Sequence, residues 1–163
     1  MPDDRPRRMW RQGREIDPEF EPTEPLFSRC AKKDIVEGDE NSTDVLSSIA
    51  VRFPDFSVNR GKYSEPEDVL IPSVGQPPDI YAQMGIVKFT VGTARWGHQP
   101  NASPIKYEMR VEHNPDEDNY SHSEVKTYKD GNYDSGVKIN TTIKKEYRAR
   151  LARGAEVVRR PAI

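Results

Sequence analysis

The chain has 163 residues, a formal net charge of −2 at pH 7 and a single cysteine. That length fits one domain, since single domains cluster at roughly 100 to 150 residues, and it leaves little material for a second core. The small charge excludes a global field that draws the protein onto nucleic acid or an anionic membrane. The single cysteine excludes an intrachain disulfide and a multi-cysteine metal site.

Composition favours a sheet over helices. Valine and isoleucine number 23 against 4 leucines, and β-branched side chains lose rotamer freedom in a helix but fit a pleated surface. The 14 prolines also oppose long helices, because each removes a backbone donor. Leu, Ile, Val and Phe make up 32 of the 163 residues, close to the roughly 20% level below which chains tend to be disordered, so part of the chain is expected to lack structure.

The sequence is expected to contain neither a membrane span nor a secretory signal. No apolar run approaches the roughly 20 residues of a membrane span, and the amino terminus lacks the apolar region of a secretory signal. We therefore expect no membrane association and a cytoplasmic location.

Residues 1–25 form the first segment, in which arginines are interspersed with acidic residues and prolines. They show neither a helical nor an alternating apolar period, which is typical of an extended arm that orders on a partner. We therefore divide the chain into a flexible arm, residues 1–25, and a single α+β domain, residues 26–163. The arm's candidate partner-binding residues are Arg7, Arg8, Trp10 and Arg11.

Three segments in the first half of the domain predict strands. Residues 26–36 indicate an edge strand. Residues 46–58 alternate around Pro54, which splits them into two short strands because proline cannot donate to a ladder. Residues 86–91 have the pattern of a central strand.

A short helix and a closing strand complete this outline. Ser64 and Glu67 have the spacing of a capping box, so a helix should begin there and end before Pro72. Residues 155–161 are expected to form a last strand at the carboxy terminus.

Residues 107–113 alternate strictly between apolar and charged side chains, apart from the terminal histidine, and residues 121–128 form a partner strand after a short acidic loop. The loop is too short for a parallel crossover, so the two strands should form an antiparallel hairpin. Opposite charges directly across the strands contribute about 0.2 to 1 kcal/mol per pair. The preferred register places Glu108 opposite Lys126, Arg110 opposite Glu124 and Glu112 opposite His122.

This register sends His113 and His122 to opposite faces of the sheet, so they cannot share a metal ion or act as a catalytic pair. In a functional interpretation, His122 forms an acid–base or metal site with Glu112 and Glu124. The alternative is a solvated row of cross-strand salt bridges, with His113 closing the edge of the core. The catalytic candidates are therefore His113, His122 and Glu124, and no sequence motif indicates a metal ion or a cofactor.

Residues 140–154 give the clearest helix, with Asn140 or Thr141 as its cap. An apolar stripe along this helix is expected to lie on the apolar face of the strands. The stripe consists of Ile143, Tyr147 and Leu151, and the face beneath it of Val87, Phe89, Val91, Met109 and Val111.

The carboxy-terminal residues 141–163 carry seven lysines and arginines against two glutamates. Such a local excess can contact phosphates or an acidic partner. The alternative is a solvated helix face whose long side chains cover apolar surface. The helix residues proposed to bind a partner are Lys144, Lys145 and Arg148.

The fold class expected is α+β: a mainly antiparallel sheet of short strands packed by the C-terminal amphipathic helix, with a flexible N-terminal arm. Cys30 is interpreted as an inert core residue. Because no catalytic motif is present, the first hypothesis is an intracellular protein-interaction module or accessory subunit whose partner is another protein. Two alternatives are a small hydrolase or nuclease that acts on RNA or a nucleotide through a histidine, and a nonenzymatic nucleic-acid-binding protein. The oligomeric state is left open.

Overall fold

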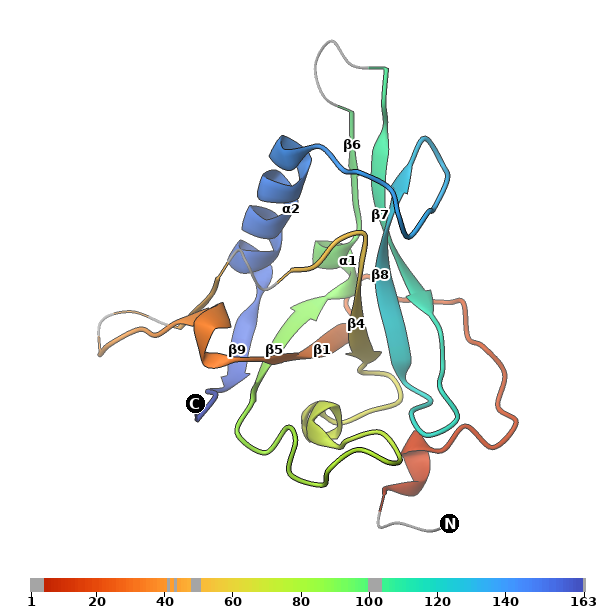
Figure 1. Cartoon of the computed structure of the whole chain (residues 1–163), viewed down its shortest axis with the longest axis vertical. Helices are drawn as coiled ribbons and strands as arrows, with labels where there is room; N and C mark the ends of the chain where they lie inside the picture. Colours follow the sequence, from red (N-terminus) through yellow and green to blue (C-terminus); the bar gives the residue numbers. More distant parts are fainter. Residues whose placement is uncertain (1–4, 41, 43, 48–50, 100–103, 163) are drawn as a thin grey trace.

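The computed structural model describes residues 5–40, 42, 44–47, 51–99 and 104–162. The fold is α+β, with a curled antiparallel sheet of seven strands in the order β6-β7-β8-β4-β1-β5-β9 (Figure 1). This confirms the predicted class. The strands of this sheet are β1 (Pro25–Cys30), β4 (Asp55–Arg60), β5 (Gly85–Thr90), β6 (Trp96–His98), β7 (Tyr107–His113), β8 (His122–Lys129) and β9 (Glu156–Arg159).

The other elements are short, apart from one C-terminal helix. Two short strands, β2 and β3, pair with each other in a separate antiparallel sheet. The bounds are η1 (Arg7–Met9), η2 (Lys32–Asp34), β2 (Ile35–Val36), β3 (Val45–Leu46), η4 (Pro66–Leu70), α1 (Val91–Ala94) and α2 (Thr141–Gly154).

The predicted strands agree with the structure in part. Of the two strands predicted in residues 46–58, the one after Pro54 is present as β4, whereas residues 51–54 lie in no strand. Residues 86–91 were expected to form a central strand, but β5 lies next to the edge strand β9. Residues 107–113 form β7 with the predicted bounds, and β4 begins directly after Pro54. The segment expected at the sheet edge contains β1, which instead lies between β4 and β5 and pairs with both. Its burial explains this position, because Leu26 and Cys30 are covered by core residues on one face of the sheet.

The predicted short helix is present as the 3-10 helix η4, but its cap lies one residue later than expected. Ser64 is used elsewhere, since its hydroxyl donates to the carbonyl of Arg60 at 2.8 Å. The carboxylate of Asp68 accepts from the amide of Glu65 at 3.0 Å instead. Pro66, at the first helical position, favours this start because it lacks an amide hydrogen.

The inner face of the sheet carries the main core. Asn140 caps α2, because its side-chain oxygen accepts from the amide of Thr142 at 2.8 Å. The hydroxyl of the buried Tyr147 donates to the carbonyl of Ala94 at 2.6 Å, which ties α2 to α1. The cluster that contains this tyrosine also includes Ile143, Leu151, Val87, Phe89, Val91, Met109, Val111 and Val125.

The outer face of the sheet is divided into an apolar and a polar half. Over β1 and β5, η4 covers a small cluster that contains Phe27, Val69 and Ile86. Over β4, β8 and β7 the side chains on this face are polar, among them Ser57 and His122. The polar half is where the candidate site lies.

The predicted hairpin register is wrong by two residues. Glu112 lies opposite Glu124 rather than His122, and Val111 lies opposite Val125. The register is consistent with apolar packing, because the two valines meet on the buried face. The two like charges are bridged by Lys126, whose ammonium lies 3.7 and 3.4 Å from the two carboxylates. A shift of two residues preserves the faces, so the two histidines still lie on opposite sides of the sheet.

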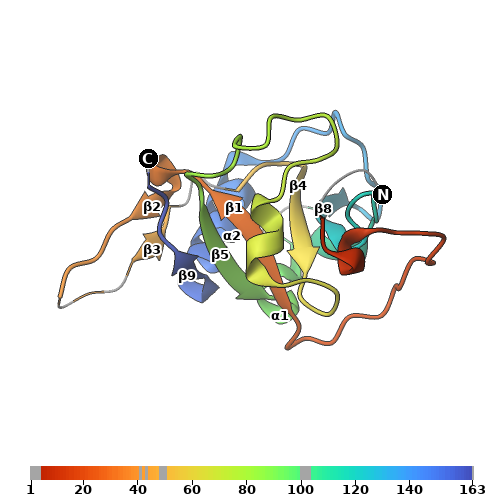
Figure 2. The same ribbon diagram turned by 90° about the horizontal axis from the view of Figure 1, so that it is seen from below.

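The segment expected to be a free arm contacts the rest of the chain at several points between residues 5 and 24, although part of it forms a loop that arches out at the side of the molecule (Figures 1 and 2). Met9 is buried and its carbonyl accepts from the amide of Tyr120 at 2.7 Å. The guanidinium of Arg8 makes two hydrogen bonds to Asp68, at 2.8 and 2.7 Å. Sequence periodicity did not indicate this, because the contacts are made to residues 60 to 111 positions away.

Candidate functional site

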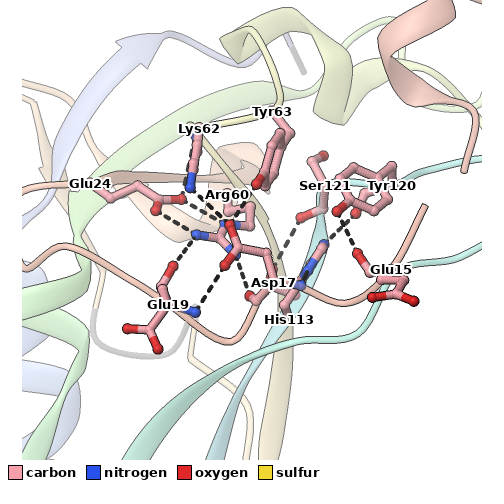
Figure 3. A network of polar contacts seen from close by, with 11 residues as sticks. Glu15, Asp17, Glu19, Glu24, Arg60, Lys62, Tyr63, His113, Tyr120 and Ser121 are labelled. Atoms are coloured by element: carbon pink, nitrogen blue, oxygen red, sulfur yellow. Dashed lines mark hydrogen bonds and ion pairs between the residues drawn. The ribbon is translucent and has the colours of Figure 1, made fainter.

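His113 is buried at the end of β7, and both of its ring nitrogens are bonded to backbone groups (Figure 3). Nδ1 accepts from the amide of Asp17 at 2.8 Å, and Nε2 lies 2.6 Å from the carbonyl of Tyr120. A carbonyl only accepts, so the proton is on Nε2 and the ring is neutral. Burial lowers the pKa of His113, which favours the same state. This histidine therefore has no free lone pair for acid–base or metal chemistry.

Arg60 is the centre of the polar network in Figure 3, and its side chain is fully buried. Its guanidinium bonds both oxygens of Glu24, at 2.9 and 2.8 Å. It also donates to the carbonyls of Asp17 and Glu19, at 2.7 and 2.6 Å, and its carbon lies 3.8 Å from the ring centre of Phe20. Every donor nitrogen is used, so the network holds residues 17–24 against β4 and leaves nothing for a ligand.

Asp17 carries the exposed side of this network. Its carboxylate accepts from the hydroxyl of Tyr63 at 2.5 Å and from the ammonium of Lys62 at 2.9 Å. These bonds, in that order, hold the pKa of Asp17 well below its usual range. Sequence reasoning missed the network, although Arg60 shares the buried register of β4 with Val58, and an arginine on an apolar face requires an acidic partner.

His122 has a different environment on the outer face. Its Nδ1 lies 2.7 Å from the carbonyl of Asn114, and its Nε2 lies 3.1 Å from the hydroxyl oxygen of Ser57. Because a carbonyl only accepts, Nδ1 carries the proton and the lone pair of Nε2 faces the serine hydroxyl. This is the tautomer and orientation that a general base requires in order to activate a serine.

Two carboxylates lie beside this pair. An oxygen of Asp116 is 3.8 Å from Nδ1 of His122, close enough to stabilise a positive charge on the ring. Glu124, a predicted catalytic candidate, is the cross-strand partner of Ser57 and accepts from the side-chain amide of Asn114 at 3.1 Å. Glu124 therefore supports the residue that orients His122.

Asn59 adds a donor to the same face. It follows Ser57 by two positions on β4, lies directly opposite His122 and is only 4% exposed. Its side-chain oxygen accepts from Asn119 at 2.8 Å, but its Nδ2 has no hydrogen-bond partner among the described residues. A buried unpaired donor costs about 1 to 3 kcal/mol. Sequence spacing did not indicate this residue or Ser57, because neither belongs to a short motif.

The predicted partner-binding residues of the arm are largely engaged within the chain. Arg8 is paired with the buried Asp68, and Arg11 donates to two backbone carbonyls. Trp10 is half-buried, whereas Arg7 is exposed. Arg8 and Arg11 therefore hold the arm in place through contacts within the chain.

The basic residues of α2 are also partly engaged. The guanidinium of Arg148 donates to the carbonyl of Val51 at 3.2 Å and lies 5.1 Å from the ring centre of Phe53. Lys144 lies 6.0 Å from the same ring, and Lys145 is exposed. Figure 1 places α2 and η1 at opposite ends of the molecule, so the two basic segments do not form one patch.

Other chemistry is limited in the part of the chain that the structure describes. Burial raises the pKa of the Cys30 thiol to about 11, so the reactive thiolate is scarce at neutral pH. Within the described ranges, no group of three or more His, Cys, Asp or Glu side chains is arranged to hold a metal ion. Over the same residues, no helix has the length and apolar character to cross a membrane.

Comparison with family models, curated proteins and solved structures gave no match. What the protein does is therefore inferred from the geometry of the site itself.

Proposed function

We propose that the protein is a small hydrolase in which Ser57 is the nucleophile and His122 is the general base. The observation that carries this proposal is the 3.1 Å contact between Nε2 of His122 and Oγ of Ser57, with the opposite ring nitrogen held by the carbonyl of Asn114. A nucleophile within hydrogen-bond reach of an oriented base is the geometric requirement for covalent catalysis.

In this mechanism, Oγ of Ser57 attacks the carbonyl carbon of an ester and passes its proton to Nε2 of His122. A negative charge develops on the carbonyl oxygen in this step. His122 then returns the proton to the leaving alkoxide as the C–O bond breaks, which leaves an acyl group on the serine. Water deprotonated by His122 hydrolyses this acyl-enzyme and restores Ser57.

The charge near the serine favours a carboxylic ester or thioester over RNA or a nucleotide. Asp116 and Glu124 flank the Ser57–His122 pair, and the ammonium of Lys126 is already shared between Glu124 and Glu112. A phosphodiester would bring further negative charge next to these carboxylates, and like charges a few ångströms apart repel. A neutral acyl group carries no such cost.

The test measures hydrolysis of 4-nitrophenyl acetate and covalent labelling by a fluorophosphonate probe. Ser57→Ala should abolish labelling, and His122→Ala should lower kcat/KM by about 100-fold or more, because general bases contribute about 10² to 10⁴. Ser135→Ala and His98→Ala are matched controls at positions outside the site and should behave as the wild type. Equal labelling of Ser57→Ala and the wild type would exclude the proposed nucleophile.

A noncatalytic, intracellular interaction module is the second candidate, and one exposed apolar pair favours it. Val36 and Val45 face each other across β2 and β3 and are 63% and 44% exposed. If these valines contact a partner protein, the V36S/V45S variant should bind the purified partner at least about tenfold more weakly than the wild type does. The reason is that each buried apolar side chain contributes about 1.5 to 3 kcal/mol. Ile80→Ser, at another exposed position, is the control. Equal affinity of the double variant and the wild type contradicts this candidate.

A further inference from the structure

A hollow of about 570 Å³ lies beside β6 and β7, at the edge of the sheet. Its volume is in the range of small-molecule sites, which span about 300 to 1,000 Å³. The charged side chains around it are those of Arg95, Lys106, Glu108, Arg110 and Glu112.

Gly97 leaves open space beside this hollow. It pairs with Glu108 across β6 and β7, and a Cβ added to this glycine would meet no heavy atom within 4 Å. Its backbone is not in the left-handed region, so a side chain can be introduced there without strain. The missing side chain therefore keeps a space that a ligand can occupy.

The side chains around the hollow leave positive charge uncompensated. Glu108 is the carboxylate nearest to two of the cations, at 3.9 Å from Lys106 and 3.3 Å from Arg110. The guanidinium of Arg95 makes no hydrogen bond or ion pair with the described residues, and its ring contact with Phe20 is long, at 5.9 Å. Three cations thus face two carboxylates.

Arg110 is arranged to accept an oxyanion. Within the described chain its Nε donates to Glu108 and its side chain also hydrogen-bonds Tyr128, and because a guanidinium has five N–H donors, donors remain for a ligand. The guanidinium lies 4.0 Å from the ring centre of Tyr128, which holds its plane in place. A guanidinium held in this way can bind a carboxylate or phosphate with two parallel hydrogen bonds.

The hollow is also connected to the candidate catalytic pair. Glu112 lies at the hollow, is paired with Glu124, and Glu124 is paired with Ser57. These three residues form one row across β7, β8 and β4, and because neighbouring strands lie about 4.8 Å apart, the row is about 10 Å long. A small extended molecule can therefore reach from the hollow to the serine on one face of the sheet.

We propose that this hollow binds a compact oxyanion, a carboxylate or a phosphate, through Arg95 and Arg110. Its role as the site for the anionic end of an acyl substrate rests on the proposed hydrolase function. The charge distribution supports separate places for the anionic end and the ester group of the substrate. The hollow has excess positive charge, whereas the surroundings of Ser57 are acidic. The substrate class is thus an ester whose acyl chain ends in an anionic group.

Binding is tested first, without catalysis, by titrating the full chain with glutarate and, separately, with inorganic phosphate in a calorimeter. We expect Arg95→Ala to weaken binding at least fivefold and Gly97→Val to abolish it, whereas Arg153→Ala, an exposed arginine of α2, has no effect. Thermal unfolding of each variant checks that the fold is retained. Preference for one of the two anions identifies the ligand's headgroup. Equal binding of both anions by Gly97→Val and the wild type overturns the inference.

Catalysis is tested with two esters, 4-nitrophenyl acetate and the mono-4-nitrophenyl ester of decanedioic acid, whose extended ten-carbon chain is long enough to span the row of about 10 Å between the hollow and Ser57. Gly97→Val should raise KM for the charged ester at least fivefold more than KM for the acetate, which has no anionic end. An equal effect on both esters removes the hollow from substrate recognition. If neither ester is cleaved but glutarate binding still requires Gly97, the hydrolase proposal fails while the anion site stands.

Discussion

The buried pair of Arg60 and Glu24 allows a stability prediction of defined size. Glu24→Gln keeps the shape of the side chain but removes its charge and replaces one acceptor by an amide donor that faces the guanidinium. The two bonds at issue are 2.9 and 2.8 Å long, and the two side chains are 0% and 7% exposed. Loss of one partner from a buried pair costs about 3 to 5 kcal/mol, and because the carboxylate of Asp17 stays 3.7 Å from the guanidinium of Arg60, we expect a loss near the lower end of this range.

The assay is equilibrium unfolding in urea followed by tryptophan fluorescence. In thermal unfolding, a loss of 3 to 5 kcal/mol in the free energy of unfolding corresponds to a fall in Tm of about 6 to 20 °C, since each kcal/mol shifts Tm by about 2 to 4 °C at this chain length. Glu156→Gln is the matched control, because that carboxylate pairs with Lys88 at 3.2 Å on the surface, where such pairs contribute about 0 to 1 kcal/mol.

Two results would refute this reasoning. A free energy of unfolding for Glu24→Gln within about 1 kcal/mol of the wild type would show that the pair is not needed to balance the buried guanidinium. An equal loss in Glu156→Gln would show that the effect does not depend on burial. The double variant E24L/R60M adds a further check, because removal of both charges should cost less than the sum of the two single changes.

Three further outcomes are expected. The contacts of Asp17 lower its pKa in the folded state, so below about pH 4 the unfolded chain binds more protons and the free energy of unfolding falls as the pH drops. Urea unfolding at pH 7 and pH 3 should show a smaller decrease in this free energy for Asp17→Asn than for the wild type. An equal decrease contradicts the assignment. Cys30, whose pKa burial raises to about 11, should react with a disulfide reagent at pH 8 only after unfolding, and prompt reaction of the folded protein contradicts its burial. Leu151→Asp should unfold the domain because it places a carboxylate in the core. Arg153→Asp, on the exposed side of α2, should leave the domain folded. Circular dichroism during heating compares the two variants, and equal Tm values contradict the packing of Leu151 in the core.

The elements that could be predicted from the sequence depend on residues close together in the chain. The strand 107–113 follows from alternation, and the helix cap at Asn140 follows from a side-chain oxygen next to the first amides of the helix. The faces of β7 and β8 also follow, because the side-chain period of a strand is two, so a register error of two residues leaves His113 and His122 on opposite sides.

The pairings between distant segments could not be predicted in this way. Ser57 and His122 are 65 positions apart, and Arg60 bonds carbonyls 41 and 43 positions away. No periodicity links such residues, because the strand order brings them together only when the sheet forms. The place of Arg60 on the apolar register of β4 gave a local sign that an acidic partner exists, but not which residue it is.

Alternation, proline positions and capping side chains thus determined the strands, the C-terminal helix and the α+β class, since each acts over a few residues of backbone. Tertiary structure alone decided that β1 is interior and that residues between 5 and 24 contact distant parts of the chain. It also decided that Ser57 lies beside His122, whereas backbone groups occupy both ring nitrogens of His113. The physical reason is that these outcomes depend on which strands become neighbours, and that choice is made by burial and charge compensation over the whole chain.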